Sequence, residues 1–179
     1  MSEASNKMAH IISEWWKECI EDERDEEPDQ KARKNWKGDS AALRRARTPN
    51  EVVFVPAYHD LYHKLINADV NVGRESIAIV AGILSHVKKN SGTENAFPTE
   101  MGSSKEGSKD KAKVSSLRFR RLLAEKDSHK MYPMMIRLIR LMKGHVNLVD
   151  LANDVYWWNE KTRKDWAYEY YAAAPSSEK

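Results

Sequence analysis

The sequence predicts an all-α protein in which two small helical subdomains are joined by a flexible linker. Its 179 residues include only 7 glycines and 6 prolines, about 7% of the chain against roughly 12% in average usage. This scarcity of chain-breaking residues favours helices over a many-stranded sheet. Apolar residues recur at helical spacing along most of the chain. Glycine, serine and charged residues gather in residues 90–113, which we expect to be a mobile linker between residues 1–89 and residues 114–174.

The first helix is predicted from an apolar stripe near the N-terminus. Adjacent side chains on a helix point about 100° apart, so one of Trp15 and Trp16 is expected in the core and the other at its rim. On the same stripe Cys19 is predicted to be a buried small hydrophobe rather than a nucleophile. Residues 21–37 contain Pro28 and no apolar periodicity, which indicates an exposed loop or a frayed helix end. The stripe follows the i, i+3, i+4, i+7 pattern of one helical face and consists of Met8, Ile11, Ile12, Trp15, Trp16 and Cys19.

Two further helices are predicted before the linker. Residues 48–51 read Thr-Pro-Asn-Glu, with a hydroxyl that can cap, proline at the first helical position and glutamate three residues after the threonine. A helix should begin there, and Pro56 should kink it or break it. The run from Ile77 to Val87 is apolar on nearly every side, as in a helix at the centre of a bundle.

Four helices are predicted after the linker, and they form a small bundle over residues 114–174. Ser115 or Ser116 can cap the first helix, and Pro133 opens the second, which runs to Lys143. Residues 162–165 resemble a capping box that opens the fourth helix. Residues 175–179 are a short tail. The third helix carries the apolar stripe Leu148, Leu151, Val155 and Trp158.

Charge is sorted along the chain, although the net charge is only +3. Residues 14–29 hold nine acids and two bases, whereas residues 31–47 hold seven bases and one acid. A second basic block, residues 105–121, carries seven bases and two acids. Such segregation points to a polyanionic partner, with a solvated face as the alternative.

Several classes of protein are excluded by composition. Charged residues make up 32% of the chain and no stretch approaches the roughly 20 apolar residues that a bilayer requires. The first residues are polar and lack the pattern of a secretory signal, so we expect a cytoplasmic protein without membrane contact. The single cysteine excludes an internal disulfide and a cysteine-rich metal site.

Only one pattern in the sequence suggests catalysis. His59 and His63 lie four residues apart, a spacing at which two histidines on a helix can share a metal ion. The zinc-protease motif needs glutamate after the first histidine, where this chain has Asp60, and no third ligand stands out. No phosphate-binding glycine loop is present. We therefore expect no enzymatic activity and no cofactor, and a metal-dependent hydrolase built on His59 and His63 is kept as an alternative.

Arginine patches are the better candidates for binding a polyanion. Guanidinium groups in several patches, without base-reading loops, bind phosphates independently of sequence. Ordinary solvated charge is the alternative for each of these arginines. Arg137 and Arg140 could instead pair with internal carboxylates such as Asp150 or Asp154. The patches are Arg44 and Arg45, Arg118 and Arg121 on a helix flank, and Arg137 and Arg140 as a ridge on an otherwise apolar helix.

Taken in order, five short segments between Trp16 and Tyr171 resemble the CasB family, the small subunit of the type I-E CRISPR surveillance complex Cascade. Each segment is short, and their order along the chain carries the resemblance. The segments are Leu43-Arg44-Arg45-Ala46-Arg47-Thr48-Pro49, Ala57-Tyr58-x-x-Leu61-Tyr62, Val114-Ser115-Ser116-Leu117-Arg118-Phe119-Arg120-Arg121-Leu122-Leu123, Asp150-Leu151-x-x-Asp154-x-x-x-Trp158-Asn159 and Arg163-x-x-Trp166-Ala167-x-x-Tyr170.

The resemblance implies an all-helical, non-catalytic subunit that stabilises the R-loop by holding the displaced DNA strand. Its implied partners are the other Cascade subunits, guide RNA, the target and displaced strands, and a second copy of itself. A helical protein–protein adaptor without nucleic-acid contact remains the alternative. The resemblance assigns phosphate binding to Arg44, Arg45, Arg118 and Arg137, and helical geometry adds Arg74, Arg121, Arg140 and Lys161.

Overall fold

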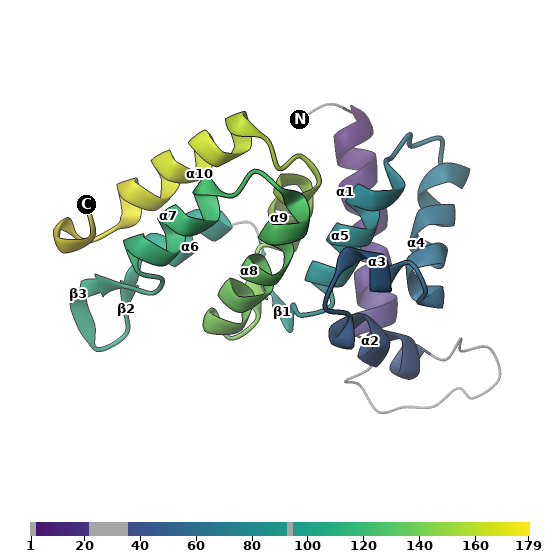
Figure 1. Cartoon of the computed structure of the whole chain (residues 1–179), viewed down its shortest axis with the longest axis horizontal. Helices are drawn as coiled ribbons and strands as arrows, with labels where there is room; N and C mark the ends of the chain where they lie inside the picture. The colour runs from purple at the N-terminus through teal and green to yellow at the C-terminus, as the bar shows by residue number, and fades with distance from the viewer. Residues whose placement is uncertain (1–2, 22–35, 93–94) are drawn as a thin grey trace.

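The computed structural model describes residues 3–21, 36–92 and 95–179 (Figure 1), and its architecture confirms the predicted all-α class. Within these ranges, four strands of two to five residues accompany the helices: β1 (Lys89–Asn90), β2 (Ser104–Lys105), β3 (Ser108–Ala112) and β4 (His145–Val146). The α-helices are α1 (Glu3–Trp16), α2 (Trp36–Arg45), α3 (Pro49–Val52), α4 (Pro56–Asn67), α5 (Arg74–Leu84), α6 (Phe97–Gly102), α7 (Ser116–Ala124), α8 (Ser128–Leu141), α9 (Leu148–Tyr156) and α10 (Glu160–Ala173). A π-helical turn, η1 (Lys17–Glu21), extends α1, and a 3-10 turn, η3 (Ser176–Glu178), lies in the C-terminal tail.

The molecule is elongated, with α1 to α5 at one end and α6, α7, α10 and the β2–β3 hairpin at the other (Figure 1). Helices α8 and α9 lie between these groups, and both contact α5. A parallel pairing of β1 with β4 aligns Lys89 with His145 and Asn90 with Val146. The side chain of Asn90 also accepts a hydrogen bond from the backbone of Leu148 at 3.2 Å. The first and second halves of the chain are therefore joined by direct contacts.

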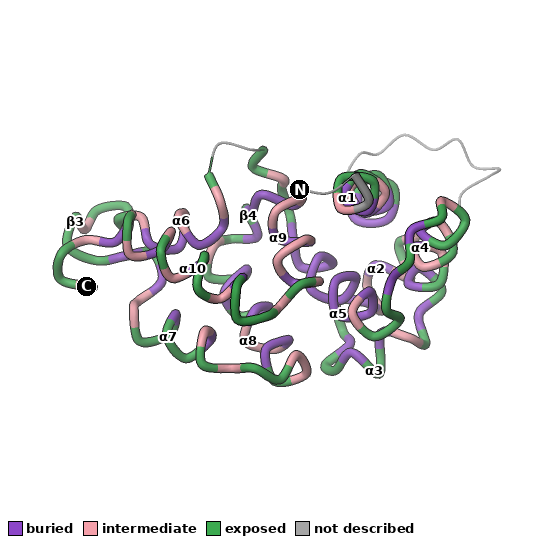
Figure 2. The backbone as a smooth tube through the Cα atoms, turned by 90° about the horizontal axis from the view of Figure 1, so that it is seen from above, coloured by how far each residue is buried: buried purple, intermediate pink, exposed green. Residues whose placement is uncertain are grey.

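One buried apolar cluster runs from α1 to α10 (Figure 2). Helix α5 lies at its centre, because every residue from Ile77 to Leu84 is buried, as the apolar run predicted. Trp15 and Trp16 are both fully buried, and their indole N–H groups donate to the backbone oxygens of Ala57 and Leu84. The expected rim position for one of them is therefore wrong, whereas the burial of Cys19 is confirmed.

Segment 90–113 differs from the predicted mobile linker. Its described residues form α6 and the β2–β3 hairpin, and Phe97 and Met101 are buried in the core. Helix α6 packs closely on α10: a Cβ atom added to Gly102 would lie 2.4 Å from the backbone oxygen of Tyr170. The described part of this segment is folded because two large apolar side chains anchor an otherwise polar sequence. The division at residues 89 and 114 stays a prediction.

Several helix boundaries also differ from those predicted. A short helix begins at Pro49 as expected, but it ends at Val52 and α4 starts at Pro56, so this proline marks a break. Helix α8 begins at Ser128, where the Asp127 side chain caps the backbone N–H of His129, and Pro133 lies inside the helix. Helix α10 begins at Glu160 behind an Asn159 cap, not at residue 162. Helix α2 was not predicted at all. Within the described ranges, no helix combines the length and apolar character needed to cross a bilayer.

Candidate nucleic-acid interface

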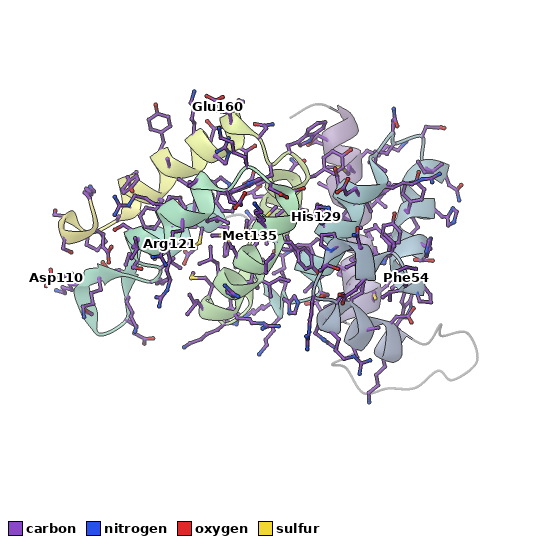
Figure 3. The ribbon with its side chains drawn as sticks, in the orientation of Figure 1. Phe54, Asp110, Arg121, His129, Met135 and Glu160 are labelled. Atoms are coloured by element: carbon purple, nitrogen blue, oxygen red, sulfur yellow. The ribbon has the colours of Figure 1, made fainter. Side chains whose placement is uncertain are left out.

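A groove between α7 and α8 brings together four of the eight predicted phosphate-binding residues. Its volume is about 510 Å³. Figure 3 marks Arg121 on α7 and Met135 on α8, the two helices that form its walls. We refer to this site as the arginine groove. It is lined by Arg118, Arg121, Arg137 and Arg140 and by four apolar residues, Leu122, Met134, Leu138 and Leu141.

The sequence places the arginines through helical spacing. On α7, Phe119 and Leu122 are buried, which leaves Arg118 and Arg121, three residues apart, on the exposed flank. The Phe119 ring stacks on Tyr170 of α10 with centroids 3.9 Å apart, and this contact fixes the orientation of α7. Buried residues of α8 likewise leave Arg137 and Arg140 exposed at the same spacing; they are Met131, Tyr132, Met135, Ile136, Leu138 and Ile139. The two arginine pairs therefore line one groove.

Internal carboxylates do not neutralise this groove. Within the part of the chain that the structure describes, Arg118, Arg121 and Arg137 form no ion pair or side-chain hydrogen bond. The Asp150 carboxylate accepts a hydrogen bond from Asn147 at 2.6 Å, and Asp154 accepts one from the Trp166 indole at 2.7 Å. Burial raises the pKa of Asp154 to about 6. These carboxylates are thus held by other groups, and the guanidinium groups of the groove remain available to a ligand.

His86 connects the groove electrostatically to α2. It follows α5 and is buried, and its Nε2 atom has no hydrogen-bond partner among the described residues. Burial, together with the positive charges of Arg140 and Arg44, lowers the pKa of His86 to about 4. Arg44 of α2 and Arg140 of α8 therefore contribute to one positive potential, and the exposed Arg45 lies beside Arg44. No motif in the sequence marks His86, which is notable there only for its position at the end of the apolar run.

The two remaining predicted residues, Arg74 and Lys161, lie apart from the groove. Arg74 begins α5, whose 11 residues span about 16 Å, and His86 follows the other end of that helix. The guanidinium of Arg74 lies 5.8 Å from the centre of the Tyr62 ring. Lys161 forms an ion pair with Asp165 at 2.6 Å on α10. Both residues have local partners, and the structure does not bring them to the groove.

The histidine pair proposed as an alternative metal site lies on α4. The Nε2 atom of His59 is 2.7 Å from the backbone oxygen of Val53, so this ring nitrogen already has a partner. His63 is exposed one helical turn further along. Across the described residues, no group of three or more histidine, cysteine, aspartate or glutamate side chains is placed to hold a metal ion. The donor set for a metal-dependent hydrolase is therefore incomplete there.

Comparison with known proteins gives two kinds of match. A chain in the crystal structure of E. coli Cascade bound to a PAM-containing dsDNA target is 14% identical, with a TM-score of 0.64 over 93% of this chain and 97% of that chain. CasB from Thermus thermophilus is 18% identical, with a TM-score of 0.63 over 97% of this chain and 100% of that one. At these identities the likeness shows the fold. Among curated protein sequences there is no significant match.

The family model described as CRISPR-associated protein Cse2 matches residues 39–171. This range covers most of the chain, from within α2 to within α10, and includes every residue that lines the arginine groove. It also contains the segments on which the resemblance to the CasB family was based, and that resemblance is confirmed. The chain therefore belongs to the Cse2 family of CRISPR-associated proteins.

Proposed function

We propose that this protein is a non-catalytic small subunit of a type I-E Cascade complex. In that role it binds nucleic-acid backbone without reading sequence and stabilises the R-loop by holding the displaced DNA strand. Its partners are the other Cascade subunits, guide RNA, the target and displaced strands and a second copy of itself in the cytoplasm. Membership of the Cse2 family and a fold shared with a chain of DNA-bound Cascade support this proposal.

The arginine groove is the observation that carries the proposal. Guanidinium groups bind phosphate oxygens through paired, charge-assisted hydrogen bonds. The lining residues are arginine, leucine and methionine, so the groove offers positive charge and apolar surface but no asparagine or glutamine for pairing with the edge of adenine. Such a surface positions a backbone without selecting a sequence.

The energetics of R-loop formation give these contacts a function. Exchange of a DNA duplex for a guide-RNA heteroduplex is nearly balanced in free energy. A few backbone contacts that hold the displaced strand are therefore enough to shift the equilibrium toward the open R-loop. The proposed role requires positive charge at fixed positions and no chemistry, in agreement with a subunit that is not an enzyme.

The apolar floor of the groove favours a second candidate, a protein adaptor. Leu141 is half exposed at the edge of the groove, and Leu117 on α7 is also half exposed. An amphipathic helix with acidic flanks would bury these side chains and pair with the surrounding arginines. In this alternative, the protein connects Cascade subunits without touching nucleic acid.

Binding of fluorescently labelled single-stranded DNA by the isolated protein separates the two candidates. For the variant with Arg118→Ala and Arg121→Ala, we expect roughly tenfold weaker binding to all base compositions alike. Lys161→Ala, which removes one positive charge outside the groove, serves as a control and should bind like the wild type. No measurable DNA binding by the wild type, together with binding of an acidic helical peptide, would establish the adaptor instead.

Assembly tests the role within the complex. The same double variant should still co-purify with guide RNA and the other Cascade subunits, because its arginines are exposed and support no internal contact. The displaced strand of the assembled R-loop should become more sensitive to a single-strand nuclease. Unchanged nuclease protection in a fully assembled complex would contradict the proposed role of the groove.

A further inference from the structure

A second hollow adjoins the arginine groove at the end of α8. Its volume is about 500 Å³, and Leu141 belongs to the walls of both. The second hollow continues to the β2–β3 hairpin, which contributes Lys105 and Glu106. Lys143 and His145 are exposed on its other side. A continuous surface therefore leads from the groove past Leu141 to the hairpin.

The hairpin presents lysines outward for a simple geometric reason. Successive side chains of a strand point to opposite faces, so Lys109 and Lys111 of β3 share one face while Asp110 and Ala112 share the other. Ala112 at the base of the strand is buried, whereas Lys109, Asp110 and Lys111 are all exposed to solvent. Figure 3 marks Asp110 at the outer end of the molecule. Across the described chain, the exposed side chains of Lys105, Lys109 and Lys111 form no ion pair, and Lys111 lies close enough to Glu178 of the tail to help lower the pKa of that carboxyl.

The hairpin is fixed in place by the rest of the chain. At its base, Lys113 pairs with Glu100 of α6 at 2.6 Å, and its backbone N–H donates to Ser103 at 2.9 Å. The C-terminal tail holds the outer strand, since Ser177 donates to the backbone oxygen of Asp110. The tail residues 175–179 therefore support the hairpin, although the sequence suggested no role for them. A held hairpin presents its lysines at fixed positions, so less entropy is lost when a ligand binds.

Resting on the proposed function, we propose that the single strand bound in the arginine groove continues past Leu141 and over the β2–β3 hairpin. There Lys105, Lys109 and Lys111 bind its phosphates. The two sites differ in kind: the groove combines arginines with apolar surface, whereas the cations of the hairpin are lysines, which act as point charges and lie among the exposed acids Glu106 and Asp110. The hairpin thus lengthens the segment of the strand that is bound and increases the salt dependence of binding, without adding contacts to the bases.

Strand length provides the test. A strand of about 4 nucleotides occupies the groove, whereas one of about 30 nucleotides also reaches the hairpin. For the triple variant Lys105→Ala, Lys109→Ala and Lys111→Ala, we expect the salt slope of log affinity to fall by about 2 on the long strand, at about 0.7 per phosphate contact. Binding of the short strand should be unchanged. A matched control, Lys7→Ala with Lys161→Ala and Lys164→Ala, removes the same charge from α1 and α10 and should leave both slopes unchanged.

Each outcome has a distinct meaning. If the triple variant and the control bind the long strand alike while the wild type still shows salt-dependent binding, the hairpin proposal is wrong and the arginine groove stands. An equal loss on short and long strands would also overturn it, because the lysines would then act on the groove itself. If the wild type binds neither strand, the proposed function fails and the hairpin proposal fails with it. Thermal unfolding of the triple variant should match the wild type, since the three side chains are exposed.

Discussion

Gly102 lies where α6 meets α10, at a position with no room for a side chain. A Cβ atom there would lie 2.4 Å from the backbone oxygen of Tyr170, and a backbone atom in a packed helix cannot move aside. We expect Gly102→Ala to lower the free energy of unfolding by about 1–3 kcal/mol, as overpacked cores do. Chemical denaturation measures the loss. Gly73→Ala is a suitable control, because its Cβ would meet only the Ser76 side chain at 3.4 Å, and a loss of equal size there would contradict this explanation.

His86 should make stability depend on pH. Its pKa in the folded protein is about 4, whereas an unperturbed histidine has a pKa near 6.5. The unfolded chain therefore binds more protons between these values, so the contribution of neutral His86 is fully present above about pH 6.5 and is lost as the pH falls toward 4. We expect His86→Leu to remove this part of the acid destabilisation.

Denaturation of the wild type and the His86→Leu variant at several pH values tests this expectation. Asp154 titrates in an overlapping range with the opposite effect, because burial raises its pKa to about 6. Both proteins contain Asp154, so its contribution cancels in the difference between them. A difference in stability that does not change between pH 4 and 6.5 would show that His86 is not responsible.

On the helices, arginines that bind a ligand differ from structural arginines in two ways: their side chains are exposed to solvent, and they form no hydrogen bonds with other described residues of the protein. Arg137 and Arg140 are exposed on α8, whereas Arg163 of α10 donates to the backbone oxygen of Leu123 at 2.9 Å. We expect Arg137→Ala with Arg140→Ala to weaken single-strand binding with little change in Tm. Arg163→Ala should show the reverse pattern, because an internal hydrogen bond is lost. A large drop in Tm with unchanged DNA affinity for the α8 variant would return those two arginines to a structural role.

Helices with a strong apolar pattern could be predicted, and those formed by tertiary contacts could not. The run from Ile77 to Leu84 is continuous and became the central helix α5, as expected. Helices α2 and α6 were missed because each places only a few buried side chains within polar or charged sequence. Phe97 and Met101 of α6 gain their burial from α10, which lies far along the chain. A contact between segments so far apart in the chain cannot be predicted from the local composition of either one.

The candidate site was predictable to a similar degree. Spacing of three residues placed Arg118 with Arg121 and Arg137 with Arg140, and the structure confirms that both pairs are exposed. That the pairs share one groove depends on how α7 and α8 pack, which spacing does not determine. Helical geometry also suggests Arg74 and Lys161 as phosphate-binding residues. In the structure, however, Arg74 lies over the ring of Tyr62 and Lys161 forms an ion pair with Asp165. The hairpin lysines were not predicted as binding residues because they lie in segment 90–113, which its composition indicated to be a linker.

For the whole molecule, the continuous core predicts cooperative unfolding. Helices α8 and α9 both contact α5, and the buried cluster extends from α1 to α10 without interruption. We therefore expect thermal unfolding followed by circular dichroism and by tryptophan fluorescence to give one coincident transition. Two separated transitions would instead favour independent subdomains divided at segment 90–113, and limited proteolysis within that segment would then yield two stable fragments.

The charge distribution of the molecule agrees with a single binding face. On α10, Lys161 and Lys164 pair with Asp165 and Glu160, so positive and negative charges are balanced there. Around the arginine groove and the β2–β3 hairpin, the cations have few such partners among the described residues. A net charge of only +3 is thus compatible with a locally positive surface at the arginine groove. Long-range attraction of a polyanion follows from this local potential rather than from the net charge.

The salt dependence of single-strand binding decides whether the arginine groove binds a nucleic-acid backbone. For the wild type, log affinity should fall linearly with log salt concentration, because each phosphate that the protein neutralises releases counterions. Each such phosphate contributes about 0.7 to the slope. Replacing the four groove arginines, Arg118, Arg121, Arg137 and Arg140, with alanine should reduce that slope by about 3 while the protein stays folded. A folded quadruple variant that binds single-stranded DNA with the wild-type affinity and the wild-type salt slope would contradict the account.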